Sequence, residues 1–525
     1  MNDRQRWTLI AAVLGSSIVF VDSSVVTVAL PRIGRELPTS ILGVLEGQLY
    51  VYTGYLLTLS ALLILAGALS DYYGRRRIFL IGLVGFGLTS VLCGLAPNME
   101  FLVLSRVLQG MAGAILVPGS LALLTATFTG EAQGRAYGVW AAATAATTIL
   151  GPFIGGILVD TISWRIAFLI NVPLVVVAVW ATVVHVPESR NEKATAHFDW
   201  LGAVVVAVAV GGLSFGATYG QQRDWRDPLA YVALATGAVA TIAFPFLMAR
   251  SREPLVPLEL FRSRNFTVTN ISTFLIYGAL YVTFYYLALF LQGVLGYSAS
   301  AAGLAGIPGG ILLVVLSTRF GALSARYGPK IFMTVGPALM AVGVLWFARV
   351  PSTSPAWAFT PGDPSSWAPP SQYFVDFLVG QIIFGLGLAM MVAPLTTALM
   401  TSVPVRNSGV ASAINNAISR VGPQLAGAVI FVAITASFYS GMAARVPGTD
   451  TSDPAFRHDY PPMTVRRTDD PRALAARDQS TDAFHLAMYV GAALLIAGAL
   501  VNAVGISNDV ALKAAERAEP VTTTA

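Results

Sequence analysis

The stretch Gly67-Ala-Leu-Ser-Asp-Tyr-Tyr-Gly-Arg-Arg-Arg77 lies between two long apolar runs and recurs in the second half of the chain. The second copy reads Gly321-Ala-Leu-Ser-Ala-Arg-Tyr-Gly-Pro-Lys330 and begins 321 − 67 = 254 residues later, close to half of the 525-residue chain. Each copy joins the ends of two runs long enough to cross a bilayer, and its glycines permit a sharp turn. The pattern predicts a duplicated membrane protein with this turn at the membrane surface.

The composition is that of a helical membrane protein. Hydrophobic residues make up 55% of the chain and charged residues 11%, which is too apolar for a soluble core of this length. A single cysteine, Cys93, and four scattered histidines predict neither a disulfide framework nor a metal site. We expect no bound cofactor.

Apolar runs of spanning length predict an all-α polytopic protein with fourteen transmembrane segments. The first run continues past the length of a signal peptide without a small-residue cleavage site, so we expect it to be retained as the first span. The runs cover residues 7–30, 47–70, 78–97, 101–124, 136–158, 166–184, 200–219, 229–248, 268–294, 300–323, 331–349, 374–400, 408–438 and 483–505.

Charge in the short loops predicts the orientation. Thirteen of their lysines and arginines fall on one side of the membrane and six on the other, so the positive-inside rule places both termini in the cytoplasm. The long segment 441–480 is predicted to be a polar outer loop. The net charge of +5 is explained by these inner-face arginines, and we expect no nucleic-acid partner.

A second internal match extends the duplication. Gly151-Pro-Phe-Ile-Gly-Gly156 in the fifth run corresponds to Gly422-Pro-Gln-Leu-Ala-Gly427 in the thirteenth. Two halves of six spans leave two surplus spans between them. We therefore divide the chain into a first six-helix bundle, two additional helices with linkers, a second six-helix bundle and a cytoplasmic tail, at residues 1–190, 191–265, 266–508 and 509–525.

These motifs resemble the major facilitator superfamily, and within it the drug:proton antiporters with fourteen spans. The resemblance covers nearly the whole chain and rests on the shared order of several segments. Besides the Gly67 loop and the Gly151 motif these are Val21-Asp-Ser-Ser-Val-Val-Thr-Val-Ala-Leu-Pro31, Arg106-Val-Leu-Gln-Gly110, Trp164-Arg-Ile-Ala-Phe-Leu-Ile-Asn-Val-Pro173 and Glu253-Pro-Leu-Val-Pro-Leu-Glu-Leu-Phe-Arg262.

The resemblance implies the major facilitator fold, in which two six-helix bundles surround a central cavity that opens alternately to each face. It also implies that substrate and proton move in opposite directions, with the proton gradient as the energy source. One departure stands out: the second copy of the loop has Ala325 where the first has Asp71, so an acid-based gate would be asymmetric.

The Gly67 loop is the candidate conformational gate, formed by Gly67, Asp71, Gly74, Arg75 and Glu131. Asp71 is expected at the positive N-terminus of the thirteenth span, where a helix dipole favours an anion. Arg75 would then need another acid, and Glu131 in the loop after the fourth span is the candidate. The alternative is that the arginines only set the topology while Asp71 caps a turn.

The fifth span carries the family's antiporter motif, Gly151, Pro152, Gly155 and Gly156. Glycines on adjacent turns permit close helix contact, and the proline removes a helix hydrogen bond and kinks the span. The prediction of export rather than uptake rests mainly on this motif. The alternative is plain helix packing.

Candidate cavity residues lie in the ninth and thirteenth spans. Tyr277, Tyr281 and Tyr285 recur every four residues and share a helix face, too deep in the span for an interfacial aromatic belt. Asn415 and Asn416 need polar partners inside the membrane, which are either the cavity or another helix.

The candidate proton-coupling pair is Asp22 with Arg106. Asp22 lies about 12 Å and Arg106 about 8 Å below the outer ends of their spans, at 1.5 Å per residue. Charges inside a span usually face a partner, so we expect the two to meet. Burial favours the neutral acid and the guanidinium favours the carboxylate, so a change in their surroundings would switch proton binding. The alternative is a static ion pair.

Taken together, the residues and the resemblance predict a monomeric, proton-driven exporter of amphipathic small molecules in a bacterial cytoplasmic membrane. Asp22 is the only carboxylate well inside a span, which favours neutral or singly charged substrates. A dedicated exporter of one natural product or lipid is the alternative within transport. A membrane enzyme or receptor is disfavoured because no catalytic constellation, nucleotide loop or soluble domain is present in the sequence.

Overall fold

The computed structural model describes residues 1–39, 44–190, 198–223, 225–360, 362–446, 450–463 and 471–508, and within these ranges it contains helices and no strand. The first half comprises α1 (Asp3–Glu36), α2 (Val44–Tyr73), α3 (Arg75–Gly94), α4 (Met99–Thr127), α5 (Gly130–Thr161), the short α6 (Ile166–Leu169) and α7 (Asn171–His185). The surplus helices are α8 (Trp200–Gln222) and α9 (Pro228–Arg250).

The second half repeats this plan with more interruptions. Its long helices are α10 (Arg264–Leu289), α11 (Ala299–Tyr327), α12 (Lys330–Phe347), α14 (Val379–Thr401), α15 (Ser408–Arg445) and α17 (Pro471–Gly505). Its short elements are η1 (Leu258–Arg262), η2 (Phe290–Val294), η3 (Pro364–Ser366), α13 (Ser371–Tyr373), η4 (Phe374–Leu378), η5 (Val405–Asn407) and α16 (Pro454–Asp459).

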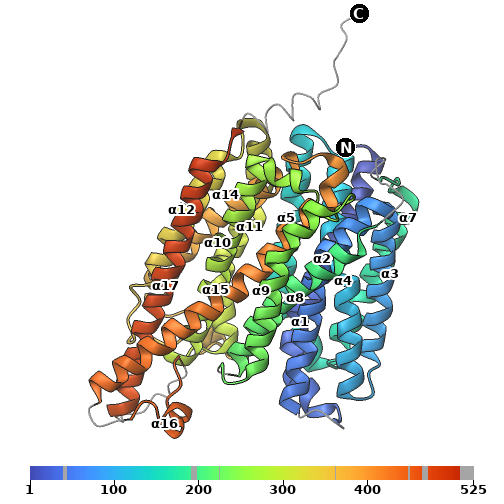
Figure 1. Cartoon of the computed structure of the whole chain (residues 1–525). Helices are drawn as coiled ribbons and strands as arrows, with labels where there is room; N and C mark the ends of the chain where they lie inside the picture. The colour runs from blue at the N-terminus through green and yellow to red at the C-terminus, as the bar shows by residue number, and fades with distance from the viewer. Residues whose placement is uncertain are drawn as a thin grey trace, which may run out of the picture.

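Each predicted span corresponds to a helix. Within the described ranges, 13 helices are long and apolar enough to cross a membrane. The remaining one, α5, is a helix of 32 residues that packs along α1 and α11. The predicted all-α architecture of two six-helix bundles with two extra helices is confirmed, and Figure 1 shows the two bundles as a blue-to-cyan group and a yellow-to-red group.

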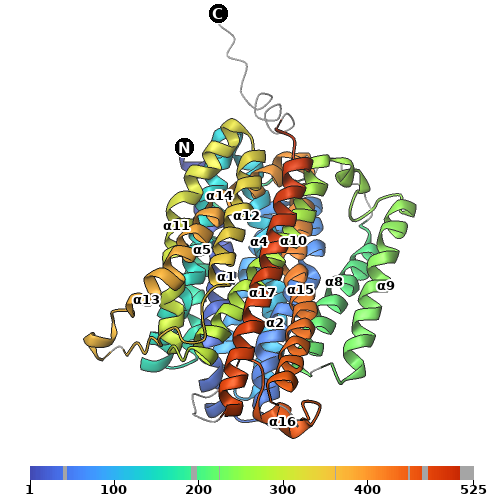
Figure 2. The ribbon, with the colours of Figure 1, turned by 90° about the vertical axis from the view of Figure 1, so that its left-hand side faces the viewer.

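The start of α1 and the end of α17 lie at the same end of the molecule in both ribbon views (Figures 1 and 2). The two halves approach each other closely at this end. A Cβ at Gly67 of α2 would lie 2.4 Å from the carbonyl oxygen of Gly409 of α15, and one at Gly134 of α5 would lie 2.6 Å from that of Gly321 of α11. The structure is therefore closed between the halves at the end that holds the N-terminus.

The segment 441–480, predicted as a polar outer loop, is partly helical. Helix α15 continues to Arg445, α17 already begins at Pro471, and α16 lies between them; residues 447–449 and 464–470 lie outside the described ranges. Charged residues lower the hydropathy of these helix ends, so the ends were not recognised as helical. These residues form ion pairs with one another. Arg445 contacts Asp482 at 3.0 Å and Asp478 at 3.6 Å, so both helices project beyond the apolar layer.

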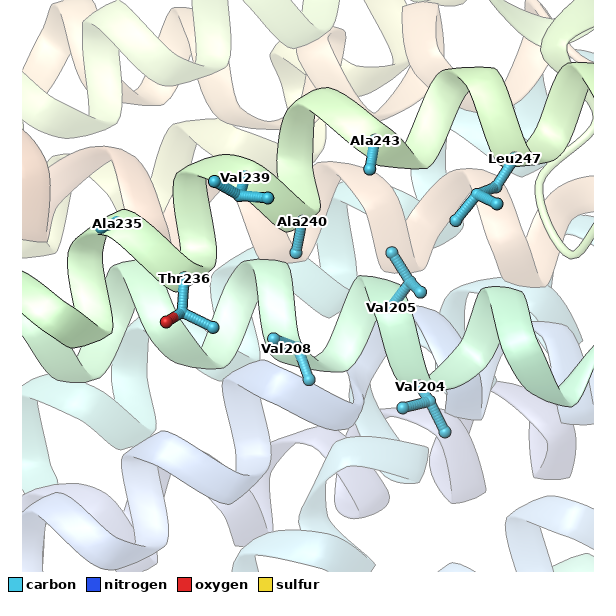
Figure 3. Close-up of a pocket in the computed structure, with 9 residues that line it drawn as sticks. All are labelled: Val204, Val205, Val208, Ala235, Thr236, Val239, Ala240, Ala243 and Leu247. Atoms are coloured by element: carbon cyan, nitrogen blue, oxygen red, sulfur yellow. The ribbon is translucent and has the colours of Figure 1, made fainter.

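The surplus helices form an appendage at the side of the bundles (Figure 2). Helix α8 packs against α2 and α15, whereas α9 packs mainly against α8. A groove with a volume of about 460 Å³ lies between α8 and α9, and its lining is apolar except for the hydroxyl of Thr236 (Figure 3). That hydroxyl donates to the Val232 carbonyl of its own helix at 2.8 Å. The groove thus presents only apolar surface, as a face in contact with lipid chains does.

Candidate functional site

Asp22 and Arg106 meet in the first half, as predicted from their depths. Arg106 Nη1 lies 2.6 Å from Asp22 Oδ2, and both side chains are fully buried. Asp22 comes from α1 and Arg106 from α4, two helices that pack together. A carboxylate and a guanidinium removed from water require each other, because either charge alone would be costly inside the membrane.

A shell of polar groups from two further residues completes the carboxylate's contacts. Its Oδ1 accepts from Gln109 Nε2 at 3.1 Å and from Asn171 Nδ2 at 3.0 Å. Gln109 also accepts from Arg106 Nη1 at 2.6 Å and donates to Ser90 Oγ at 2.8 Å. Donors from Arg106, Gln109 and Asn171 thus contact both oxygens of Asp22.

The guanidinium of Arg106 is placed by α2 as well. Its Nε donates to the Val51 carbonyl at 3.1 Å, and its central carbon lies 4.0 Å from the centre of the Tyr55 ring. A cation over an aromatic face is attracted by the ring's negative potential. Five helices, α1, α2, α3, α4 and α7, therefore supply the polar network around Asp22.

Sequence reasoning missed three members of this network, Gln109, Asn171 and Ser90. All three are fully buried. Gln109 lies three residues after Arg106, on the same helix face, so helical periodicity would have found it. Asn171 and Ser90 come from separate helices, and their placement depends on tertiary packing.

The gate residue Asp71 lies where it was predicted, at the start of α15. Its Oδ2 accepts from the backbone N–H of Val410 at 2.9 Å, and its side chain is buried. Gly67, one helical turn earlier, allows the close approach of α2 to α15 that brings the carboxylate there. The contact joins the two halves through a charge and the positive end of a helix.

The predicted pairing of Arg75 with Glu131 is wrong. Arg75 pairs with Asp71 of the preceding turn, with 2.9 Å between Nη2 and Oδ1, and also donates to the Val405 carbonyl of the second half. Glu131 instead forms an exposed pair with Arg135, one turn further along α5. Arg75 pairs with Asp71 because Asp71 is already buried beside it. Glu131 is exposed, and its carboxylate would have to lose its hydration to reach Arg75.

An acid that the sequence analysis did not consider, Glu188, closes the Gly67 loop. Its two carboxylate oxygens each accept at 3.1 Å, one from the backbone N–H of Arg76 and the other from that of Arg77. These are unsatisfied donors at the start of α3, where a helix dipole favours an anion. Gly74 just before them has φ +109°, a conformation that favours glycine.

The second copy of the loop repeats this geometry with an uncharged acceptor in place of the Glu188 carboxylate. Gly328 has φ +87°, and the N–H of Lys330 donates to Asn508 Oδ1 at 3.0 Å. Asn508 follows the last helix of its half, just as Glu188 follows α7. At the place of Asp71 stands Ala325, whose Cβ lies beside Gly134 of α5, so this copy joins the halves by close packing.

Helix α5 makes close contacts with other helices through glycines on two of its faces. A Cβ at Gly151 would lie 2.0 Å from Ser24 Oγ and one at Gly155 would lie 2.5 Å from Val25 Cγ1, both on α1 of the same half. A Cβ at Gly138 would instead lie 2.5 Å from the Thr318 Cα of the other half. The close helix contact predicted for the antiporter motif is confirmed at Gly151 and Gly155. The surroundings of Pro152 and Gly156 lie outside the described part of the structure.

The three tyrosines of α10 differ in exposure. Tyr281 is 53% and Tyr285 58% exposed, whereas Tyr277 is half-buried against the core of the second half. Tyr281 lies within electrostatic range of Tyr52 on α2, so it faces the first half. Their assignment to a cavity wall stays a prediction.

The two asparagines of α15 make hydrogen bonds within the second half. Asn415 is buried and donates to Asn270 Oδ1 at 3.2 Å and Thr273 Oγ1 at 2.9 Å, both on α10. Asn416 donates to the Ser412 carbonyl of its own helix at 2.9 Å. For Asn415 the interhelical hydrogen bond is therefore present, and the assignment of the two asparagines to the cavity stays a prediction.

Two similar halves, in contact at one end and holding a buried ion pair in one of them, define the architecture of a polytopic membrane transporter. Comparison with known proteins gives its family. A model of the Major Facilitator Superfamily matches residues 12–427, which is most of the chain. The chain belongs to the Major Facilitator Superfamily.

Curated relatives cover most of this chain. A "Multidrug resistance protein Stp" of Mycobacterium tuberculosis is 34% identical over 87% of this chain and 81% of its own. A "Tetracenomycin C resistance and export protein" of Streptomyces glaucescens is 33% identical over 81% of this chain and 75% of its own. A puromycin resistance protein of Streptomyces alboniger is 30% identical over 85% and 87% respectively.

Solved structures agree on the fold. The proton:xylose symporter XylE superposes with a TM-score of 0.56 at 16% identity, covering 94% of this chain and 94% of its own. The human organic anion transporter MFSD10 superposes with a TM-score of 0.54 at 14% identity, covering 94% of this chain and 100% of its own.

Proposed function

We propose that this protein is a proton-driven antiporter that exports amphipathic small molecules, such as antibiotics, across a bacterial cytoplasmic membrane by alternating access. The observation that carries the proposal is the fully buried Asp22–Arg106 pair among the helices of the first half. The resistance functions in the names of the curated relatives support the choice of substrate class and of export.

The end at which the halves are closed is proposed to face the cytoplasm, with both termini on that side. The excess of arginines in the loops at this end supports the orientation. In this conformation a substrate site between the halves would open outward. Breaking the Asp71–Val410 contact would let the halves rock and expose the site to the cytoplasm.

Asp22 is proposed to carry the proton. In the closed-inside conformation its two oxygens accept hydrogen bonds from Arg106, Gln109 and Asn171, and these contacts have to change when the side chain takes up a proton. Protonation adds one proton to a carboxylate oxygen and leaves Arg106 charged, so the ion pair is lost and the site must change its contacts or hydration. Coupling follows if that change accompanies rocking of the halves.

Inverted proteoliposomes test the proposal. Purified protein is reconstituted, an inside-acid pH gradient is imposed, and puromycin is added while an internal pH dye is read. We expect the drug to dissipate the gradient through the wild-type protein. Asp22→Asn should abolish this exchange, because the amide keeps the shape of the side chain but cannot ionise.

Glu36→Gln is the matched control. Glu36 lies on the same helix in an exposed pair with Arg32, so its loss removes the same charge without touching the network. We expect near-normal exchange from this variant. Exchange by Asp22→Asn at the parent rate would show that Asp22 is not the carrier and would leave the static ion pair as its role.

A further inference from the structure

Arg420 is a cation deep inside the membrane-spanning part of α15. It lies 420 − 408 = 12 residues from the start of the helix, or about 18 Å at 1.5 Å per residue. The hydrocarbon core is about 30 Å thick, so this depth is near its middle. A charge at that depth requires water, a counter-charge or a ligand.

The position of Arg420 on α15 points it toward the first half. Gly409 and Ala413, on the same helix face, pack against Gly67 of α2. Arg420 lies two turns beyond Ala413 on this face and is within electrostatic range of Tyr52 and Tyr55 of α2. Arg420 is half-buried, so part of its side chain is accessible.

The guanidinium of Arg420 has no hydrogen-bond or ion-pair partner among the described residues. The amide of Gln424, one turn along the helix, accepts nothing from it, because in the described structure Gln424 Oε1 has no partner. Arg106, the other deep arginine near Tyr55, is by contrast neutralised by Asp22.

We propose that Arg420 binds the anionic group of an amphipathic substrate, such as a carboxylate or sulfonate, between the two halves. A planar guanidinium offers paired donors that match such oxyanions. Tyr52 and the exposed Tyr281, which lie near each other, provide aromatic surface for the apolar part of the molecule. The assignment rests on the proposed export function and adds anionic amphiphiles to its substrates.

A matched pair of fluorescent probes tests the assignment. The anion 1-anilinonaphthalene-8-sulfonate and the neutral N-phenyl-1-naphthylamine share their ring system and differ in the sulfonate. Binding to purified protein in lipid nanodiscs is titrated for both. We expect R420Q to weaken binding of the sulfonate by about tenfold or more, since a charge-assisted contact is lost, and to leave the amine within about twofold. R420K should lose less affinity for the sulfonate, because lysine keeps the positive charge but lacks the paired N–H donors of a guanidinium.

R319Q is the control for loss of a positive charge. Arg319 lies on α11 between Val315 and Leu323, on an exposed face of that helix. We expect R319Q to bind both probes as the parent does. Equal losses in R420Q and R319Q, or sulfonate binding unchanged in R420Q, would overturn the proposal. If R420Q does not fold, R420K decides: unchanged sulfonate binding there would also overturn it.

Binding is measured without a proton gradient, so it is independent of antiport. If puromycin fails to dissipate the gradient while R420Q still loses the sulfonate selectively, the proposed function fails and the anion site stands. If exchange with puromycin occurs and the two probes respond alike to R420Q, only the anion site fails.

Discussion

The carboxylate of Asp71 accepts a hydrogen bond of 2.9 Å from the backbone N–H of Val410, 339 positions further along the chain. Both residues are buried, and they belong to different halves of the molecule. Arg75, which is paired with Asp71, donates to the Val405 carbonyl beside the same helix start. One ion pair of the first half thus holds the beginning of α15.

Asp71→Asn should weaken this contact and favour the conformation that is open at the same end. It removes the charge from a helix N-terminus, worth up to about 2 kcal/mol in partly buried sites, and leaves Arg75 without its acid. Spin labels at Tyr73 and Val405, both exposed, measure the separation of α2 from η5 in a Cys93→Ser background. We expect a longer mean distance and slower drug efflux. Arg77→Ala, at an exposed site of the same loop, should change neither by much.

Gly138→Val should push the halves apart by shape alone. The new side chain would meet backbone, since a Cβ at this position lies 2.5 Å from the Thr318 Cα. The expected result is reduced efflux at normal protein level, with increased labelling of cysteines placed at the start of α5 and at the end of α11. Gly306→Val on α11, where nothing lies within 4 Å of the new Cβ, is the control. Equal effects of the two substitutions would argue against a close helix contact at Gly138.

Arg106→Gln should lower the free energy of unfolding by about 3–5 kcal/mol, because it leaves the buried carboxylate of Asp22 without its cation. Adding Asp22→Asn should recover much of that loss, since an amide can stay buried with Gln109 and Asn171. Thermal unfolding of the purified variants measures both. Additive losses in the double variant would show that the two residues do not act as a pair.

Gly74→Ala should destabilise the Gly67 loop by about 1–2 kcal/mol, because alanine is strained at φ +109°. Its Cβ would also lie 2.8 Å from the Glu188 carboxylate that holds the start of α3. Glu188→Ala alone should also destabilise the loop, because it removes the hydrogen bonds to the N–H groups of Arg76 and Arg77. In that background the clash is absent, so Gly74→Ala should still cost the part that comes from backbone strain. No cost of Gly74→Ala in the Glu188→Ala background, measured by thermal unfolding, would assign the whole effect to the clash.

Tyr281→Ala should change which compounds are exported more than the rate of proton movement. The ring is 53% exposed and faces the first half, so its loss removes aromatic surface but no ionisable network. A resistance profile over a panel of amphipathic drugs measures the change. Tyr489→Ala, at a tyrosine of α17 with 54% exposure, is the matched control. Identical profiles for the two variants would remove Tyr281 from the substrate path.

The fold was predictable because the bilayer constrains it so strongly. Apolar runs gave the number of helices, and the two Gly67-type loops gave the duplication. The projecting ends of α15 and α17 escaped because their charged residues, such as Arg445 and Asp482, pair outside the apolar layer. A hydropathy pattern detects only the apolar part of a helix. It therefore does not indicate where a helix continues beyond the membrane.

The candidate site was predictable where depth or helix spacing decided it. Asp22 and Arg106 were matched by depth, and Asp71 by the attraction of an anion to a helix start. Partners fixed by tertiary packing were not accessible, which is why Glu131 was chosen for Arg75 and why Glu188 was overlooked. Arg420 was visible in the sequence, but only the fold shows that no described residue forms a hydrogen bond or ion pair with it.

The loops that begin at Gly67 and Gly321 close the same end of the molecule through different interactions. At Asp71 the closure depends on charge, so it can respond to protons, salt or an anionic surface nearby. At Gly321, where backbone meets backbone across α5 and α11, it depends only on shape. A stimulus that acts through charge therefore loosens one edge of the closed end first, and the other edge serves as the pivot. The two halves would then separate at the Asp71–Val410 contact while the contact between Gly134 and Gly321 stays in place.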